Sequence, residues 1–375
     1  MSPLRRRSLL TSGVATLFAP KTRATPASDV SFLGDGLSLS PPEYVRLLGK
    51  VAEQTGVHAD DFSRGGLIEQ VEKRFAELLG KERAVFFPTG TLANHVGVRL
   101  LAGEKRRVLI QAESHLYNDS GDCVQTLSNL NLVPLAPGRA TFTLDEVAEQ
   151  VERGDASRVF APVGAISIES PVRRKSGEAF DYGEMKRIAA YARGKGIKLH
   201  LDGARLFLAS PFTGVSVKQY AGLFDTVYVS LYKYFNAASG AVLAGPRALL
   251  DDVYHLRRTF GAGLPHSWPI AAVALHFVDG FEQRYTQAAA NVQNMLKRLA
   301  DDSRFGVDQA PGATHIVRLR VAEADPKALV ARLEQRGIAA RAPAKAGEPF
   351  LLNINESALR RSGDDLAAAF RQAAG

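Results

Sequence analysis

Two short motifs place an acid and an amine at the ends of β-like segments. Asp202 follows segment 197–201, and Lys233 follows segment 226–231. The carboxyl ends of parallel strands meet at one edge of a sheet, where α/β proteins bind ligands, so the two side chains are expected to lie together. A lysine there can form a Schiff base with an aldehyde, and a carboxylate can keep a pyridine nitrogen protonated so that the ring accepts electrons. Both properties suit pyridoxal phosphate as the cofactor.

A turn upstream of both motifs suits the phosphate of that cofactor. Thr89, Gly90 and Thr91 lie between a predicted strand, 84–87, and a predicted helix, 92–101. Free backbone N–H groups and the positive end of a helix favour a phosphate at such a turn. The turn is weak evidence alone and gains weight because the other two motifs follow it.

The sequence around Asp202 and Lys233 is compatible with a role in catalysis and also with a purely structural role. Aromatic neighbours of Lys233 are expected to remove water from its amine and lower its pKa, whereas an exposed turn lysine is the alternative. Gly203 lets a planar ring approach the backbone beside Asp202, although an aspartate at this kind of turn also serves as a helix N-cap. The order of the three motifs favours the functional interpretation. The aromatic neighbours are Tyr232, Tyr234 and Phe235.

The order of phosphate turn, aspartate and lysine resembles fold-type I pyridoxal phosphate enzymes, and the chain looks most like threonine aldolases and β-eliminating lyases. The resemblance covers roughly residues 35–275, and segments 85–94 and 200–205 are its most specific parts. It implies a lyase that cleaves the Cα–Cβ bond of a β-hydroxy amino acid to glycine, or another small amino acid, and an aldehyde. A β-eliminating lyase is the nearer alternative. An exported protein that binds the cofactor or an amino acid without turnover is the other.

The resemblance also implies roles for further residues. Arg205 matches an arginine beside the cofactor that grips the substrate carboxylate, and His115 matches the residue that stacks on the cofactor ring and is a candidate base. Asp35 and His58 match substrate-side positions, an arm aspartate and a loop tyrosine. No metal is assigned to this site.

A basic segment is implied to act across a subunit interface. Arg257 and Arg258 match an aldolase segment that reaches the active site of the neighbouring subunit. The resemblance therefore implies a homodimer or a homotetramer, with an amino acid as the small-molecule substrate.

The sequence departs from the family on the substrate side of the site. Gly34 precedes Asp35 where the family has a serine, and loop 169–174 lacks the histidine that aldolases carry. The small-domain arginine that completes carboxylate binding has no clear counterpart in segment 349–353. Threonine is therefore expected to be cleaved poorly, while bulkier β-hydroxy amino acids gain apolar contact beside Lys233. The residues expected to give that contact are Tyr232, Tyr234 and Phe235.

The first 28 residues are typical of an export signal. Arg5, Arg6 and Arg7 precede the weakly apolar, small-residue run 11–19, and no acidic residue occurs before position 29. Arg6-Arg7-Ser8-Leu9-Leu10 fits the twin-arginine form, whose pathway exports folded proteins. A periplasmic or secreted enzyme loaded with its cofactor before export is the expectation. A disordered basic N-terminus is the alternative.

Charge and hydropathy exclude two classes of partner. Five basic residues lie in segment 1–28, so the remaining chain has 42 basic and 39 acidic residues and a formal charge of +3. Such a balance leaves no electrostatic footprint for nucleic acid. No segment outside the signal has the ~18 uninterrupted apolar residues that a membrane span needs.

Alternating strand and helix patterns predict an α/β fold. The fold expected is that of fold-type I pyridoxal-phosphate-dependent transferases, with a mostly parallel sheet in a large domain and a smaller C-terminal α/β domain. Residues 29–45 form an N-terminal arm and 46–268 the large cofactor-binding domain, and 269–375 contain a linking helix and the small domain. Strands are expected at 158–161 and 165–168, and one long helix at 270–299.

Overall fold

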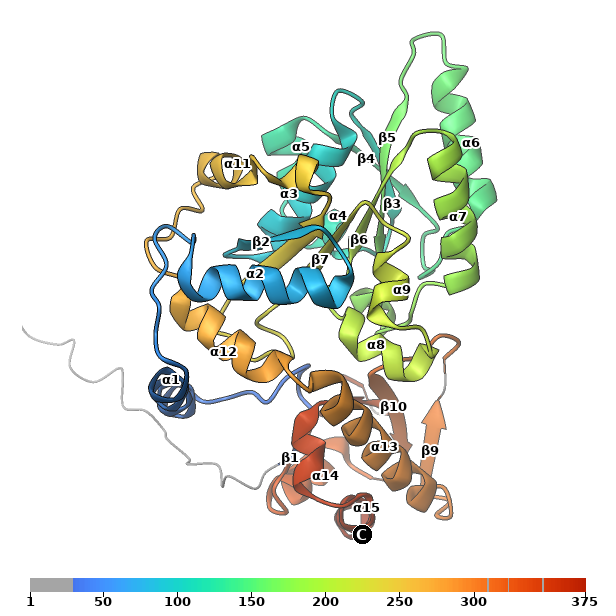
Figure 1. Ribbon diagram of the computed structural model, residues 1–375. Helices are drawn as coiled ribbons and strands as arrows, with labels where there is room; N and C mark the ends of the chain where they lie inside the picture. The colour runs from blue at the N-terminus through green and yellow to red at the C-terminus, as the bar shows by residue number, and fades with distance from the viewer. Residues whose placement is uncertain (1–29, 309, 323, 346) are drawn as a thin grey trace, which may run out of the picture.

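The computed structural model describes residues 30–308, 310–322, 324–345 and 347–375. The predicted export signal lies outside these residues. The expected α/β architecture is confirmed: a large domain holds a seven-stranded sheet between helices, and a smaller C-terminal domain lies beneath it (Figure 1). In the part of the chain described, no helix has both the length and the apolar content to cross a membrane.

The central sheet is almost entirely parallel. Only β8 runs antiparallel, and it pairs with β2 on one side and β7 on the other. The inner parallel strands are buried on both faces, as expected when helices cover a sheet from both sides. In sheet order the strands are β2 (Arg83–Phe87), β8 (Ala241–Gly245), β7 (Thr226–Ser230), β6 (Lys198–Asp202), β5 (Val163–Glu169), β3 (Arg107–Gln111) and β4 (Asn131–Leu135).

Helices pack on the two faces of this sheet as separate cores. The first face carries α2 (Gly66–Leu79), α6 (Leu144–Asp155), α7 (Tyr182–Gly194), α8 (Leu206–Thr213), α9 (Val217–Ala221) and α12 (Trp268–Val278). The opposite face carries α3 (Gly90–Ala102), α4 (His115–Asn118), α5 (Cys123–Ser128), α10 (Arg247–Leu250) and α11 (Val253–Thr259). The buried helix α3 crosses four strands, β5 to β8, so its N-terminus reaches the edge where the parallel strands end.

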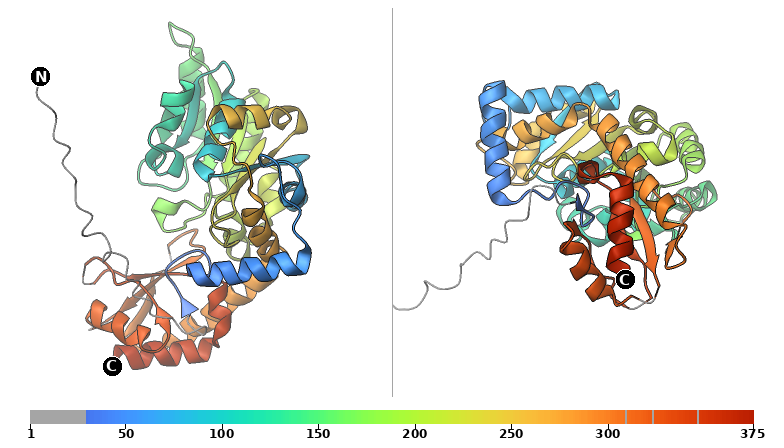
Figure 2. Two further views of the ribbon diagram at one scale, coloured as in Figure 1. Left: turned by 90° about the vertical axis from the view of Figure 1, so that its left-hand side faces the viewer. Right: turned by 90° about the horizontal axis from the view of Figure 1, so that it is seen from below.

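The small domain packs helices against an antiparallel sheet. Its helices are α13 (Phe281–Leu299), α14 (Pro326–Glu334) and α15 (Gly363–Ala374), with the 3-10 helix Glu356–Arg360; its strands are β9 (Phe305–Asp308), β10 (Ile316–Val321) and β12 (Phe350–Asn353). The N-terminal arm joins it, because β1 (Val30–Ser31) pairs in parallel with β11 (Ile338–Ala339). After the arm, α1 (Pro41–Thr55) runs beside the domain boundary (Figure 2).

Two local predictions differ from the structure, and two elements of the structure were not predicted. Segment 158–161 is an exposed loop rather than a strand, with Val159 79% exposed. The long helix predicted at 270–299 is two helices, because Gly280 adopts a left-handed conformation with φ of 70° between α12 and α13. Strand β4 was not predicted; it contains Pro134, which an edge strand tolerates. Helix α15 was not predicted either.

Candidate active site

The ends of three neighbouring strands bring the chemical groups together. Glu169 ends β5 and lies opposite Asp202, which ends β6, and Lys233 follows β7 by three residues. Together with the N-terminus of α3 they border a cavity of about 480 Å³. Seven residues predicted for the catalytic and cofactor sites line it: Thr89, Gly90, Thr91, His115, Asp202, Arg205 and Lys233.

Lys233 presents its amine to this cavity. Burial, followed by the charge of Arg205, lowers the pKa of Lys233 to about 8, which leaves more neutral amine near neutral pH. Its Nζ atom lies 5.0 Å from the ring centroid of Tyr232. The other two aromatic neighbours correct the prediction. Tyr234 and Phe235 are fully buried and pack on the ring of Phe281, so they offer no surface to a substrate.

The carboxylate of Asp202 accepts hydrogen bonds from two protein donors. The Asn94 side-chain amide donates to Oδ2 at 2.6 Å, and the Ala204 backbone N–H donates to Oδ1 at 3.1 Å. Asp202 is 3% exposed, and its free lone pairs face the cavity it lines. A buried carboxylate needs a further hydrogen-bond donor or a positive charge where its oxygens face the cavity. The protonated nitrogen of a pyridine ring meets that need, so the chemistry of the site fits pyridoxal phosphate.

The N-terminus of α3 provides the phosphate position. Thr89 is the N-cap, and its hydroxyl accepts from the Leu92 N–H at 3.3 Å. Gly90 and Thr91, as first residues of the helix, keep N–H groups without helical partners. Gly90 also permits close packing, because a Cβ there would lie 2.0 Å from the hydroxyl oxygen of Tyr228. These residues would hold the phosphate.

Glu169 fixes the loop that carries His115. Its Oε2 accepts from the His115 backbone N–H at 2.6 Å and its Oε1 from the Arg173 N–H at 2.9 Å. Burial, followed by the charge of Asp202, raises the pKa of Glu169. His115 Nδ1 lies 3.6 Å from Asp119, whose carboxylate Arg173 also contacts. His115 would cover a ring face, and Arg173 occupies the loop where aldolases carry a histidine.

Arg205 reaches the cavity while an acidic residue holds it from the side. Its Nε donates to Asp35 Oδ2 at 2.8 Å. His315 Nε2 and Asn353 Nδ2 each lie 3.5 Å from the other Asp35 oxygen. Although burial opposes ionisation, His315 and Arg205 hold the pKa of Asp35 well below its usual range. Asp35 therefore fixes the orientation of Arg205 at the edge of the cavity.

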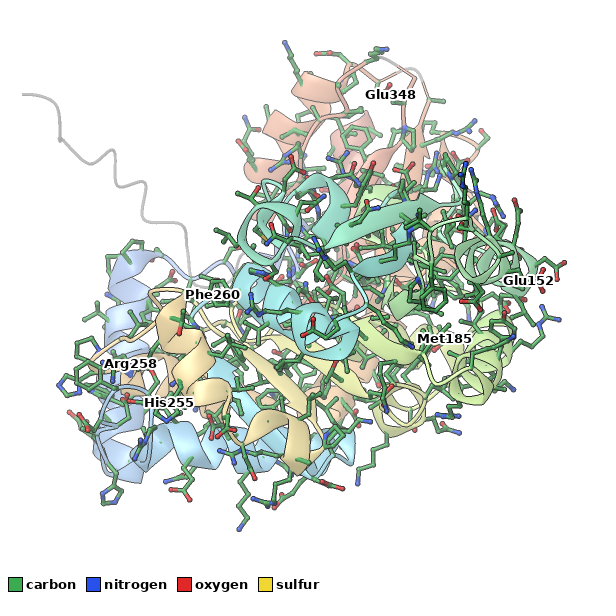
Figure 3. All side chains as sticks on the ribbon, turned by 90° about the horizontal axis from the view of Figure 1, so that it is seen from above. Glu152, Met185, His255, Arg258, Phe260 and Glu348 are labelled. Carbon is green, nitrogen blue, oxygen red and sulfur yellow. The ribbon has the colours of Figure 1, made fainter. Side chains whose placement is uncertain are left out.

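Three residues predicted to bind substrate lie away from the cavity in this chain. His58 is exposed in the loop after α1. Arg257 is 1% exposed, and its guanidinium donates to the carbonyl oxygens of Phe86 and Phe62. This corrects the prediction for Arg257, whose charge anchors backbone instead of a ligand. Arg258 is exposed on α11 at the periphery of the molecule (Figure 3). A role for Arg258 in the active site of a neighbouring subunit stays a prediction, as does a substrate-side role for His58.

A second cavity, of about 680 Å³, adjoins the first. Arg205, Tyr232 and Lys233 line both cavities. The second is bounded by the N-terminal arm and α1, including the apolar Leu39 and the ring of Tyr44. A ligand held at Arg205 would therefore have room for a large group beside Lys233.

Sequence reasoning missed residues whose roles depend on tertiary contacts. Glu169 stands at a strand end like Asp202, which is a usable signal, but no role was predicted for it from the sequence. Asn94 lies within segment 85–94, and its hydrogen bond to Asp202 spans 108 residues. No local pattern reveals such a bond.

A family model and a curated relative both match this chain. The family model described as "Beta-eliminating lyase" matches residues 51–336. The chain is 30% identical over 213 residues to the low-specificity L-threonine aldolase of Candida albicans, covering 56% of each chain. It therefore spans little more than half the length of that relative.

Solved structures share the fold over nearly the whole chain. A proposed L-allo-threonine aldolase from Listeria monocytogenes has a TM-score of 0.76 and 25% identity, covering 92% of this chain and 95% of that one. A lysine-to-alanine variant of serine palmitoyltransferase from S. paucimobilis, with a bound pyridoxal phosphate–myriocin aldimine, has a TM-score of 0.62 and 17% identity, with coverages of 92% and 87%. The second likeness concerns the fold alone, which is the fold-type I architecture.

Proposed function

Because the chain belongs to the β-eliminating lyase family, we propose that it is a pyridoxal-phosphate-dependent lyase of the threonine aldolase type. The observation that supports this proposal most directly is the arrangement of Lys233, Asp202 and the α3 N-terminus around one cavity. Its substrate is a β-hydroxy amino acid, and its products are glycine, or another small amino acid, and an aldehyde.

The chain's residues supply attachment, charge and orientation. Lys233 would provide the amine for covalent attachment, and the Asp202 carboxylate would accept a hydrogen bond from the protonated ring nitrogen. The free guanidinium nitrogens of Arg205 bind the substrate carboxylate, because Asp35 occupies its Nε. When bound, pyridoxal phosphate supplies a sink for the electron pair released at the substrate Cα.

Proton transfer at the β-hydroxyl is assigned to His115. Its ring lines the cavity, and Glu169 fixes the start of its helix. His115, directly or through a water, takes the hydroxyl proton as the Cα–Cβ bond breaks and the carbonyl of the aldehyde forms. A proton then returns to Cα, so that atoms and charge balance.

The second cavity favours substrates with large β-substituents. The methyl β-substituent of threonine would leave most of the volume of the second cavity unfilled, whereas an aromatic ring would contact Tyr232 and Leu39. We therefore place bulky β-hydroxy amino acids above threonine as substrates.

Export by the twin-arginine pathway remains part of the proposal. It is supported by the Arg6-Arg7 motif and by the need to fold around a cytoplasmic cofactor before export. The functional protein would be a homodimer or homotetramer in the periplasm or outside the cell.

The decisive experiment identifies the products formed by the purified full chain loaded with pyridoxal phosphate. Glycine and an aldehyde from a β-hydroxy amino acid support the proposal. Pyruvate and ammonia from serine without glycine would establish β-elimination instead. Bound cofactor with neither product, across substrates from threonine to β-phenylserine, would identify a binding protein without turnover.

A further inference from the structure

A chain of buried hydrogen bonds runs from Asp202 across the sheet, away from the cavity. Asn94 on α3 joins Asp202 at 2.6 Å, and its Oδ1 lies 2.8 Å from His200 Nε2. His200 Nδ1 lies 2.8 Å from the hydroxyl oxygen of Thr226 on β7. Asn94, His200 and Thr226 are each 0% exposed. None of the three lines the cavity, so the chain reaches it only through Asp202.

The direction of every bond in this chain is fixed by chemistry. A carboxylate only accepts, so the Asn94 amide nitrogen faces Asp202 and its oxygen faces His200. That oxygen also only accepts, which places a proton on His200 Nε2. Burial lowers the pKa of His200 to about 4, so the ring is neutral and its Nδ1 accepts from the Thr226 hydroxyl. Each of the three hydrogen bonds therefore has one defined direction.

Close packing restricts movement of these hydrogen-bonded side chains. A Cβ at Gly97 on α3 would lie 2.8 Å from His200 Cε1, so only glycine allows the helix this close to β6. One turn earlier on the same helix, Asn94 reaches the carboxylate. Since the Ala204 N–H holds the other carboxylate oxygen, Asp202 has no freedom to rotate.

We propose that Asn94 and His200 are positioning residues that set the orientation of Asp202 toward the ring nitrogen of pyridoxal phosphate. The inference rests on the proposed function, because it requires that the cofactor binds in this cavity. Loss of Asn94 would leave one carboxylate oxygen without its donor and free the carboxylate to turn. His200 acts one bond further away, by holding the Asn94 amide in the donating orientation.

The test uses the purified full chain and its variants, prepared without cofactor and titrated with pyridoxal phosphate. N94A should raise the dissociation constant roughly ten- to a hundredfold, the effect of losing a hydrogen bond to a charged group. H200A should raise it less, and H200Q, which retains an N–H donor, should recover part of the loss. In N94A and H200A the pH dependence of the bound cofactor's visible absorbance should also shift.

A matched control lies next to Asn94 on α3. His95 is also buried, at 1% exposure, but its Nε2 contacts the Ser128 hydroxyl at 2.6 Å, away from the cavity. H95A should lower the thermal midpoint while leaving cofactor affinity and the absorbance titration unchanged. A purely structural role for the Asn94 chain predicts that N94A and H200A behave like H95A, and that result overturns the inference.

Two further outcomes are informative. Should N94A fail to fold, T226V removes the last donor with little change of shape, and a roughly two- to fivefold weaker affinity is expected. Wild-type affinity in T226V would then overturn the inference. Failure of the unaltered chain to bind pyridoxal phosphate would instead overturn the proposed function itself.

Discussion

Asp35 and Arg205 form an ion pair that joins the N-terminal arm to the active-site edge of the sheet. Arg205 Nε donates to Asp35 Oδ2 at 2.8 Å, and the two side chains are 13% and 8% exposed. Because one side of the guanidinium is committed to Asp35, the remaining nitrogens point in one defined direction. In the proposed function, the arm would thus set the direction from which Arg205 binds a substrate carboxylate.

Asp35→Asn should weaken substrate binding more than cofactor binding. The neutral amide loses the ion pair, so Arg205 gains freedom and KM should rise about tenfold, the effect of ~1.4 kcal/mol. Steady-state kinetics and cofactor titration measure the two effects separately. D279N, which removes an exposed partner of Arg74 in a bond of the same length, is the matched control and should not change KM. An unchanged KM in D35N would show that Arg205 does not need its partner.

Attachment of pyridoxal phosphate to the cofactor-free protein should accelerate as pH rises through about 8. The pKa of Lys233 is lowered to about 8 by burial, so the reactive neutral amine predominates above that pH rather than above the usual 10.5. Stopped-flow absorbance between pH 6 and 10 gives the profile. Borohydride reduction and peptide mapping should find the adduct on Lys233 and not on the exposed Lys198. An adduct elsewhere contradicts the assignment.

Asp202→Asn should preserve the fold and lower turnover by several orders of magnitude. An amide oxygen can still accept from the Ala204 N–H, so the turn is retained. The amide no longer supplies the charge that keeps a pyridine nitrogen protonated. Circular dichroism and single-turnover kinetics test both statements. Near wild-type turnover would reduce Asp202 to a turn-forming residue.

β-Phenylserine should be cleaved with a higher kcat/KM than threonine. Arg205 lacks the second arginine expected in the family, which removes an interaction worth ~1.5–3 kcal/mol, or roughly ten- to a hundredfold, for any substrate. Only a substrate with a large side chain regains part of this binding energy, through contacts in the cavity beside Tyr232. Y232A should lower kcat/KM for β-phenylserine selectively. Efficient threonine cleavage would mean that other residues replace the missing arginine.

Replacing Arg6 and Arg7 by lysine should retain the protein in the cytoplasm. The guanidinium pair is the recognised feature of the twin-arginine signal, and lysine does not reproduce its planar hydrogen bonding. Fractionation of cells expressing both forms, with a cytoplasmic marker enzyme as control, measures the location. Equal recovery outside the cytoplasm would exclude this route.

The sequence by itself determined the framework of the site. Apolar segments ending at Asp202 and Lys233, and the turn at Gly90, carry their meaning in residue type and order, because parallel strands always end at one edge. The cavity lined by all three agrees with that logic. Sequence periodicity also indicated the general alternation of strands and helices, because that pattern depends on neighbours within a few residues, although β4 and α15 were not predicted.

The tertiary structure decided which groups act together. Asp35 lies 170 residues from Arg205, and Asn94 lies 108 residues from Asp202, so no local pattern pairs them. Arg257 looked like a ligand-binding residue, yet burial among backbone carbonyls makes it an anchor. A side chain's role depends on its solvent exposure and its nearest charges. Both are properties of the packed fold, because distant segments supply the neighbours that define them.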